Sequence, residues 1–431
     1  MAPVIMPVKT AEQIPDKSTV IIIGGGIIGL TAALTLAERG IPVVVLEKGA
    51  IAAEQSSRNL GWIRKTSRAK EDIPLAREAD RLWAGMAART GHDTGYRQSG
   101  IMFVARNDEQ MAAQEKWHRS VAGAGLDTQL LTSSDIVRQV PGGTTRWAGG
   151  IYTPSDGRAE PTLAAPAIAA AAIAKGAVIV EQCAVRSLVT TNGKVSGVIS
   201  ERGEIRCDQV LLAAGVWSRR FLGNSGINLP VLPLICSVMR TRPMEGPAEI
   251  AVGAADFSFR KHHGGGFIIT QRGALDAPLT WDHLRLGIRY LPQLRQARDN
   301  LRIGLGRHFL QDWIMARHWR NDQITPFEQQ RILDPQVNTR LNNEALKNLR
   351  AAWPVFEQAT VEQSWAGTID VTPDSSPVIS PVSRIPGLTL ATGFSGHGFG
   401  TSPAAGQLAA DLICGDKPLV DPAPYRFERL L

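Results

Sequence analysis

The stretch from Ser18 to Lys48 limits what this chain can fold into more than any other part of the sequence. A β-branched run at 20–23 predicts a buried parallel strand, and the Ala- and Leu-rich segment that stops before Gly40 predicts a helix. A second β-branched run at 43–46 predicts another strand. The turn between the first strand and the helix has the spacing G-x-G-x-x-G, formed by Gly24, Gly26 and Gly29.

This turn has the physical features of a dinucleotide site. Its glycines allow a tight bend, a close approach of the backbone to a pyrophosphate and close packing of the helix on the strand. Ile27 and Ile28 open the helix, where free N–H groups and a partial positive charge favour an anion. Glu47 ends the second strand beside Lys48 and can accept hydrogen bonds from ribose hydroxyls. We therefore predict a dinucleotide site, and this stretch alone leaves NAD and FAD equally open.

The composition sets the broad class. With 431 residues the chain is long enough for two domains, and 44% hydrophobic and 20% charged residues are typical of a globular protein. The net charge of +7 is spread without basic runs between aromatics, which argues against nucleic-acid binding. The four cysteines have no metal-ligand spacing, and His262 and His263 have no partner at such spacing, so no metal is expected.

No apolar run approaches the roughly 20 residues that cross a membrane. The longest, 164–174, ends at Lys175, and the first residues lack a basic segment followed by an apolar one. A cytoplasmic protein is the expectation, with peripheral membrane attachment left open.

Two further stretches suit a bound cofactor. The loop after the second strand contains S-S-R-N and a glycine, which can donate hydrogen bonds to phosphates and to a polar ring. Its candidates are Ser56, Ser57, Arg58 and Asn59. Near the other end, a glycine-rich turn at 393–400 enters a helix expected at about 402–413, and a helix N-terminus can stabilise negative charge.

Several motifs in a fixed order resemble the FAD-dependent amine and amino-acid oxidoreductases of the D-amino-acid oxidase superfamily, above all glycine oxidases, sarcosine oxidases and D-amino-acid dehydrogenases. The motifs span Val20 to Gly415 and read G-G-G-I-I-G-L with Glu47-Lys48, S-S-R-N-L-G, D-G-R-A-E-P, A-A-G-V-W-S, W-A-G-T-I-D-V-T-P-D-S-S-P-V-I and G-F-S-G-H-G-F-G. The resemblance implies FAD as the cofactor, and the C-terminal turn is the part that favours FAD over NAD.

The resemblance also implies which residues approach FAD. Glu47 would hold the adenosine ribose, and Val185 would meet the adenine through its backbone. The glycine-rich turn before the last helix would lie along the pyrimidine end of the flavin. The full expected set is Gly24, Gly26, Ile27, Ile28, Gly29, Glu47, Lys48, Ser56, Ser57, Arg58, Asn59, Gly61, Val185, Ala214, Gly215, Trp217, Gly367, Gly396, His397, Gly398, Phe399, Gly400 and Thr401.

The sequence departs from monomeric sarcosine oxidase at two positions. Gly367 stands where that enzyme has the cysteine that bonds to the flavin, so FAD is expected to be non-covalent. Gly400 stands where it has a lysine, which puts the fit of sarcosine itself in doubt. Arg64 aligns with an arginine near its substrate site.

The fold that these features predict is α/β. A Rossmann-type FAD-binding domain, made of 18–85, 150–221 and 366–418, is interleaved with an α+β substrate-binding domain, made of 86–149 and 222–365. The second domain is expected to rest on a mixed, largely antiparallel sheet, with strands at 231–241 and 265–270. It also contains an Arg-rich stretch, 283–302, which is expected to be a helix with a solvated face.

The implied reaction oxidises a primary or secondary amine of an amino acid to the imine by hydride transfer to flavin N5, with hydrolysis to an oxo acid or aldehyde. A substrate carboxylate requires a bidentate arginine, for which Arg64 and Arg272 are the candidates. His397 is flanked by glycines in the flavin turn and is expected to contact flavin or substrate. These three are the candidate catalytic residues.

Two other functions stay open. One is a flavoenzyme that acts on a 2-hydroxy acid or glycerol phosphate, although the T-P-D-S-S-P and G-F-S-G-H-G-F segments favour amine oxidation. The other is a flavin-bearing subunit of a hetero-oligomeric dehydrogenase. The expected partners are a small amine or amino-acid substrate and oxygen or a respiratory electron acceptor, and the Arg-rich stretch leaves a partner subunit or peripheral membrane contact open.

Overall fold

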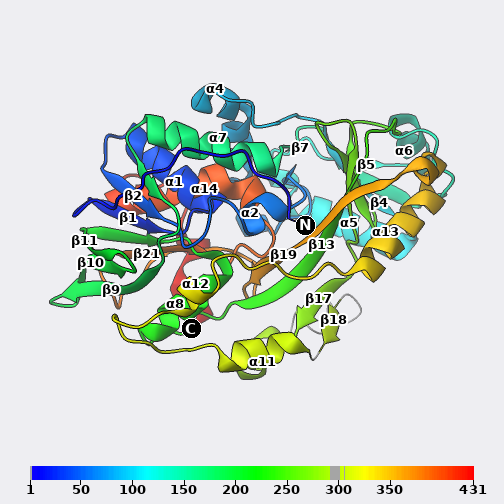
Figure 1. Cartoon of the computed structure of the whole chain (residues 1–431). Coiled ribbons are helices and arrows are strands. Elements are labelled where there is room, and N and C mark those ends of the chain that lie inside the picture. Colours follow the sequence, from blue (N-terminus) through cyan, green and yellow to red (C-terminus); the bar gives the residue numbers. More distant parts are fainter. Residues whose placement is uncertain (1, 292–300, 305) are drawn as a thin grey trace.

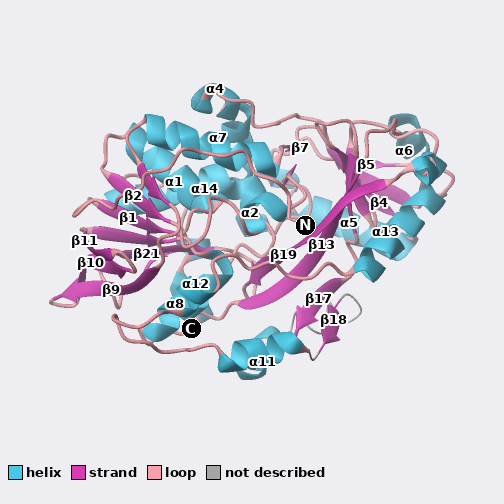
Figure 2. Cartoon of the chain, viewed as in Figure 1, coloured by secondary structure: helices cyan, strands magenta, loops and turns pink. Residues whose placement is uncertain are grey.

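The computed structural model describes residues 2–291, 301–304 and 306–431. The chain is mixed α/β, as predicted, and its strands gather into two main sheets on opposite sides of the molecule (Figure 2). Helices cover the outer faces, and the long strands β13 (Leu232–Thr241) and β19 (Val361–Val371) run through the middle (Figure 1).

The first sheet is almost wholly parallel. Its order is β20 (Val378–Pro381), β21 (Leu388–Thr392), β12 (Gln209–Leu212), β1 (Val20–Ile23), β2 (Val43–Leu46) and β8 (Val178–Val180). Only the edge strand β20 pairs antiparallel. All four residues of β1 are buried because the strand is paired on both sides and covered on both faces, which explains its continuous apolar run. The predicted strands at 20–23 and 43–46 are confirmed.

Successive side chains of β1 pack into two different cores. Val20 and Ile22 face the helices α1 (Ile27–Glu38), α7 (Pro161–Ala174) and α14 (Gly398–Cys414). Ile21 and Ile23 face a small sheet of β9 (Val185–Thr191), β10 (Lys194–Ser200) and β11 (Gly203–Arg206). Figure 1 shows these helices on one side of β1 and β2 and the small sheet on the other. The site at the end of β1 is therefore held rigidly from both sides.

The second sheet has ten strands and is largely antiparallel, as predicted. Its order is β18 (Leu301–Gly304), β17 (Leu275–Pro278), β13, β16 (Phe267–Thr270), β15 (Ser258–Lys261), β14 (Ala251–Gly253), β4 (Ile101–Ala105), β6 (Gly149–Thr153) and β5 (Gln129–Leu131), with β19 paired to β13. The pairs β17–β18 and β14–β4 are parallel. Trp353 and Phe259 centre the core between this sheet and α13 (Thr339–Ala352).

The expected domain boundaries stay a prediction. Most of β6 falls within 150–221, which is expected to belong to the FAD-binding domain. The strand nevertheless pairs with β4 and β5 in the second sheet. Likewise β19 runs across position 366 while it stays paired with β13 over its length. The expected boundaries at 150 and 366 therefore fall within strands of the second sheet.

The predicted helix at 283–302 is confirmed only at its start, 283–286. A short helix, α9 (Trp281–Leu286), is followed by a 3-10 turn, Gly287–Tyr290, and the last residues of the stretch form β18. Residues 292–300 lie outside the described residues. Parallel pairing with β17 decides the conformation of β18, since tertiary pairing overrides local helix propensity. The last helix, in turn, begins at Gly398 rather than at about 402.

The other elements are short or lie at the periphery. They are α2 (Gln55–Arg58), β3 (Trp62–Ile63), α3 (Ile73–Ala84), α4 (Met86–Thr90), α5 (Asp108–Ser120), α6 (Ser133–Gln139), β7 (Gly157–Arg158), α8 (Ser218–Asn224), α11 (Arg307–Ile314) and α12 (Pro326–Gln329). Within the described ranges, none of the helices has both the length and the apolar character needed to cross a membrane.

Helices α1 and α14 touch at Gly406, where a Cβ would lie 2.2 Å from the Thr31 hydroxyl oxygen. We expect Gly406→Ala to lower the free energy of unfolding by about 1–3 kcal/mol, because a methyl group would force the two helices apart. Chemical denaturation measures this change. Gly223→Ala in α8 is the matched control, since open space surrounds its Cβ and alanine favours a helix. An equal loss in both variants would contradict the close packing.

Candidate active site

A cavity of about 520 Å³ begins at the carboxyl ends of β1 and β2 and extends to β13 and β16 of the second sheet. The expected residues that line it are Gly24, Gly26, Ile27, Ile28, Glu47, Lys48, Ser56, Arg58, Asn59, Gly61, Arg64, Val185, Ala214, Gly215, Trp217, Arg272, Gly396, His397, Gly398, Phe399 and Gly400. The structure therefore brings the N-terminal turn, the C-terminal turn and both candidate arginines to one cavity.

Four expected residues lie behind the cavity wall instead. A Cβ on Gly29 would lie 2.2 Å from the Gly24 carbonyl oxygen, so this glycine serves the packing of helix on strand. The hydroxyls of Ser57 and Thr401 donate to backbone carbonyls, at 3.3 Å and 3.0 Å. Gly367 lies in β19, where a Cβ would meet Gln55 Oε1 at 2.2 Å.

The end of the cavity at β1 has the shape expected of a dinucleotide cradle. Gly24 has φ +113, and a Cβ there would lie 2.5 Å from the Ala213 carbonyl oxygen. The carboxylate of Glu47 accepts hydrogen bonds from the backbone N–H groups of Gly25 and Gly49, both at 2.7 Å. Burial raises the pKa of Glu47 although Lys48 and these N–H groups oppose it.

The loop after β2 is held by its own side chains. The Arg58 guanidinium donates to Asp334 at 2.6 Å and to the Ala366 carbonyl at 3.0 Å, so it is committed to the protein rather than free for phosphates. Asn59 accepts from the Gly61 N–H at 2.8 Å and caps α2. Ser56 Oγ accepts the Ile27 N–H, at 2.9 Å, at the start of α1. These side chains shape the cavity wall.

Lys48 and Trp217 form part of the wall in the same way. The Lys48 ammonium donates to Glu54 at 2.8 Å and lies 4.3 Å from the centre of the Trp217 ring. The Trp217 N–H also donates to both Glu54 oxygens, at 3.1 Å. Because its donors are satisfied within the protein, Lys48 has no free N–H aimed at the cavity in this arrangement.

The C-terminal turn delivers His397 to the cavity at the N-terminus of α14. Its Nδ1 is buried and has no hydrogen-bond partner. Burial lowers the pKa of His397 well below its usual value, and the nearby charges of Arg68 and Arg64 lower it further. The imidazole is therefore neutral at physiological pH and free to make one more hydrogen bond.

Gly400 sits where a larger residue has little room. A Cβ there would lie 2.7 Å from the Trp62 carbonyl oxygen and 3.7 Å from Arg68 Nη2. The Gly400 carbonyl accepts the Trp83 N–H at 2.9 Å, which fixes the turn from behind. The arginine at 68 thus takes up the space beside this glycine.

Arg64, Arg68 and Arg272 all line the cavity, and Arg272 follows β16 of the second sheet. Burial lowers the pKa of Arg64 to about 10, although Asp156 opposes this, and desolvation together with Arg64 lowers the pKa of Arg272 to about 9. Arg68 is 3% exposed and its Nη1 has no partner. Sequence reasoning missed Arg68, and its only signal was its place four residues after Arg64.

A second charged cluster lies just behind Gly61. Arg260 of β15 donates to both oxygens of Glu160, at 2.6 Å and 2.9 Å, and also to the Leu60 carbonyl. Ligand atoms of Glu160, His262 and His263 lie within 4.8 Å of one another, which the sequence spacing did not predict. Because Arg260 occupies the carboxylate, the cluster already contains its cation.

The cavity fits FAD on the observations above. Gly24 and Gly29 leave no room for side chains at the turn, and several buried polar atoms of residues that line the cavity lack protein partners. These atoms are His397 Nδ1, Arg68 Nη1 and Gln55 Oε1. A ligand with both an anionic and a polar aromatic part would satisfy such a set.

Comparisons with known proteins agree with this reading. The family described as FAD dependent oxidoreductase matches residues 19–412. Glycine oxidase of Pseudomonas aeruginosa is 27% identical over 94% of this chain and 97% of its own length. The beta subunit of sarcosine oxidase from Rhizobium meliloti is 25% identical over 95% of this chain and 88% of its own length.

Among solved structures, L-amino acid deaminase from Proteus myxofaciens, in complex with anthranilate, is 31% identical, with a TM-score of 0.96. The match covers 100% of this chain and 97% of that one. The predicted resemblance is thus confirmed over nearly the whole length. The chain belongs to the FAD-dependent oxidoreductase family, and its cofactor is FAD rather than NAD.

Proposed function

We propose that this enzyme oxidises the amine of an amino acid to the imine, which water then hydrolyses to an oxo acid or aldehyde. The observation that carries the proposal is the pair Arg64 and Arg272, which face the cavity that also receives the turn before α14. Guanidinium groups that line a cavity and form no ion pair with the protein are suited to bind a substrate carboxylate. Relatives that act on glycine and other amino acids, and the anthranilate complex of one neighbour, support the same conclusion.

The protein groups have distinct roles in this proposal. FAD, when bound, supplies the acceptor for the hydride. The Rossmann-type unit around Gly24 and Glu47 holds the ADP half, and the N-terminus of α14 stabilises negative charge on the flavin ring. Arg64 holds the α-carboxylate of the substrate, and Arg272 lines the same cavity. His397, kept neutral by its surroundings, makes a hydrogen bond to the flavin or to the substrate amine.

A flavin-reduction screen tests the proposal. Purified holoenzyme is mixed without oxygen with amino acids, N-methyl amino acids, 2-hydroxy acids and glycerol phosphate, and the visible flavin absorbance is recorded. Amino acids or their N-methyl forms are expected to bleach the flavin. Bleaching by 2-hydroxy acids or glycerol phosphate alone would replace the proposal by the alternative function. A flavin that no amino acid reduces without an added protein would point to a subunit of a larger dehydrogenase.

FAD is expected to be bound without a covalent link. A cysteine side chain at Gly367 would collide with Gln55, and Cys236 is the one cysteine of the chain that lines the cavity. Burial raises the pKa of Cys236, so its thiol is a poor nucleophile. Acid precipitation should therefore leave the flavin in the supernatant. Flavin that stays with the pellet of the wild-type protein would contradict this prediction. Flavin that then appears in the supernatant of the Cys236→Ser variant would identify Cys236 as the link.

The segment around α9 and α11 offers a basic and apolar surface. Its exposed apolar side chains are Leu284, Ile288, Leu310, Trp313 and Ile314, which are 55–81% exposed. Arg285 and Arg302 are exposed on the same segment. Amphipathic segments that combine exposed Trp, Ile and Leu with arginine bind anionic lipid surfaces.

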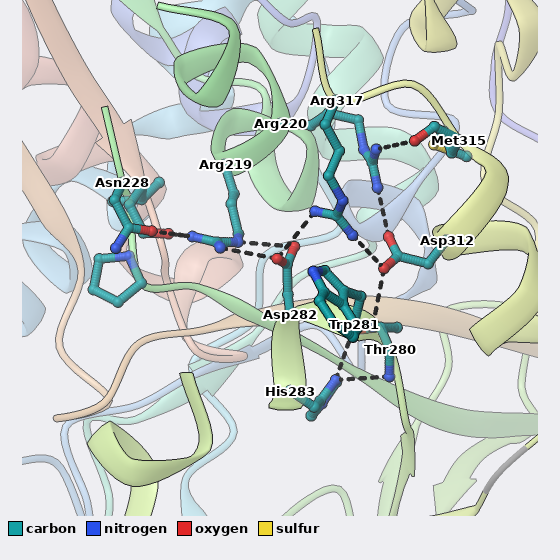
Figure 3. Close-up of polar contacts among 12 residues, drawn as sticks. Arg219, Arg220, Asn228, Thr280, Trp281, Asp282, His283, Asp312, Met315 and Arg317 are labelled. Atoms are coloured by element: carbon teal, nitrogen blue, oxygen red, sulfur yellow. Dashed lines mark hydrogen bonds and ion pairs between the residues drawn. The ribbon is translucent and has the colours of Figure 1, made fainter. Parts of the chain in front are cut away.

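This segment is pinned to the rest of the enzyme by ion pairs. Figure 3 shows Arg219 and Arg220 pointing towards Asp282 and Asp312. Arg317 bridges the same two carboxylates at 3.1 Å and 2.8 Å. The arginines of α8 thus hold the segment around α9 and α11 in an arrangement that leaves its apolar side chains on the surface.

We therefore propose that an otherwise cytoplasmic enzyme uses this surface to contact a membrane, where a respiratory acceptor takes the electrons. Wild-type holoenzyme is expected to sediment with phosphatidylglycerol vesicles, and the double variant Ile288→Ser, Ile314→Ser to stay in the supernatant. Leu130→Ser on β5, 41% exposed, is the matched control and should sediment normally. Wild-type protein that ignores vesicles but elutes as an oligomer would favour a partner subunit instead.

A further inference from the structure

Three guanidinium groups lie at the end of the cavity where the substrate is proposed to bind. Among the described residues, Arg64, Arg68 and Arg272 form no ion pair. Their hydrogen bonds go to backbone carbonyls instead. Arg64 donates to the Thr66 carbonyl, Arg68 to the Arg64 carbonyl at 3.2 Å, and Arg272 to the Ala254 carbonyl at 3.2 Å. This end of the cavity is therefore strongly positive.

The carboxylates that line the cavity are engaged elsewhere. Glu47 accepts two backbone N–H groups, and Glu54 pairs with Lys48. Asp370 accepts the Gly393 N–H at 2.6 Å. Asp156 acts on the charge of Arg64, but it is paired with Lys65 at 3.2 Å and accepts the Thr66 hydroxyl at 2.6 Å. Asp72 acts on the charge of Arg68 and accepts the Ser376 hydroxyl at 3.2 Å. Among the described residues, Arg272 is thus the arginine whose pKa no carboxylate raises.

The three charges lie at different places along the cavity. Arg64 and Arg68 are the charges that lower the pKa of His397, so both lie near the turn of α14. Arg272 follows β16 and stacks on Phe103, with its guanidinium carbon 3.9 Å from the ring centre. The Arg64 guanidinium carbon lies 5.7 Å from the same ring centre. Arg64 therefore stands between the flavin turn and Arg272.

Three arginines are more than the single carboxylate of a simple amino acid can pair with. One α-carboxylate forms a bidentate pair with one guanidinium, and a carboxylate near the flavin turn reaches Arg64 first. Arg68 sits beside Gly400, at the N-terminus of α14, where the flavin ring is proposed to lie. Arg272 is then left without a counter-ion, with its side chain exposed inside the cavity. A ligand that supplies a second negative charge can pair with Arg272 there.

We infer that the preferred substrate is an amino acid with a second anionic group, whose α-carboxylate pairs with Arg64 while the second group pairs with Arg272. The inference rests on the proposed amino-acid oxidation and names its substrate class. Acidic amino acids and N-carboxymethyl amino acids have this chemistry.

Matched substrates test the inference. Flavin reduction in the holoenzyme is measured without oxygen for glutamate against glutamine and for aspartate against asparagine, in both the L and D forms. The acidic member of a pair is expected to reduce the flavin at least about 30-fold more efficiently at limiting substrate, the value for a charge pair in a desolvated site. A preference for the amide would overturn the inference but leave amino-acid oxidation standing. Failure of every amino acid would overturn the proposed function itself.

Variants assign the two arginines. Arg272→Gln should abolish the preference for the acidic member by slowing only that substrate, whereas Arg64→Gln should slow both members. Arg119→Gln on α5, whose side chain is 69% exposed, is the matched control and should change neither. Equal losses for acidic and amide substrates in Arg272→Gln would show that one carboxylate bridges both arginines, which would overturn the inference.

A binding experiment keeps the test independent of catalysis and of the variants. Glutarate and butyrate, which carry two and one carboxylates and no amine, are titrated into wild-type holoenzyme while the flavin spectrum is recorded. Glutarate is expected to bind at least about 30-fold more tightly than butyrate. Equal affinities would contradict a second anionic subsite.

Discussion

Replacing Glu160 by glutamine is expected to lower the free energy of unfolding by about 3–5 kcal/mol. Glu160 and Arg260 are each about 1% exposed, and the glutamine keeps the shape while leaving Arg260 as an uncompensated buried charge. The pair joins the start of α7 to β15 of the second sheet, and Arg260 also holds the loop at Leu60. Chemical denaturation of the holoenzyme measures the loss.

A surface pair provides the control for this variant. Glu115 and Arg119 lie 3.5 Å apart on α5 with side chains 40% and 69% exposed. Glu115→Gln should change the free energy of unfolding by less than about 1 kcal/mol, because exposed pairs contribute little. A loss in Glu160→Gln as small as in this control would contradict the structural role of the buried pair.

The Glu160–Arg260 pair gives the enzyme a defined sensitivity to acid. Burial alone would raise the pKa of Glu160, but Arg260 outweighs it and lowers the pKa from 4.5 to about 2. Because the folded-state pKa is depressed, the pair stabilises the fold fully above about pH 5 and loses this contribution as the pH falls towards 2. Glu160→Gln should remove about 3 kcal/mol of the acid-dependent stability between these pH values.

Gly24→Ala is expected to yield protein without FAD. The Cβ would lie 2.5 Å from the Ala213 carbonyl oxygen at a residue with φ +113, so strain and collision together should cost about 3–5 kcal/mol. The loss falls on the turn that is proposed to hold the ADP half of FAD, which explains why cofactor occupancy should collapse. The ratio of flavin absorbance to protein absorbance after purification measures it.

A second glycine separates backbone strain from crowding. Gly40 has φ +71 after α1, but nothing lies within 4 Å of its Cβ position. Gly40→Ala should therefore lose about 1–3 kcal/mol of stability and keep its FAD. If Gly40→Ala also loses FAD, cofactor loss follows from strain in this unit rather than from the close approach at Gly24.

Features carried by neighbouring residues could be predicted from the sequence. The two strands and the helix of the first unit follow from local runs and glycine spacing, and the Asn192-Gly193 turn has the positive φ values, +53 and +79, that its hairpin requires. The C-terminal turn at His397 likewise follows from its glycines. In each case the chemistry is complete within one short stretch.

Features that depend on distant residues could not be predicted. The role of Arg58 is set by Asp334 and Ala366, about 280 and 310 residues away along the chain, which occupy its guanidinium. The strand β18 exists because β17 pairs with it, although the sequence predicts a helix over 283–302. Arg68 becomes a site residue only through its place beside Gly400, more than 300 residues later.

The central claim, that this enzyme removes hydride from the α-carbon of an amino acid, is tested most directly by an isotope effect on flavin reduction. Holoenzyme is mixed without oxygen with the best amino acid of the screen, in its ordinary and its α-deuterated form, and the decay of the visible flavin absorbance is followed. We predict that deuteration slows the decay several-fold while the final extent of bleaching stays the same. Identical decay rates at saturating substrate, or no bleaching by any amino acid, would contradict the account.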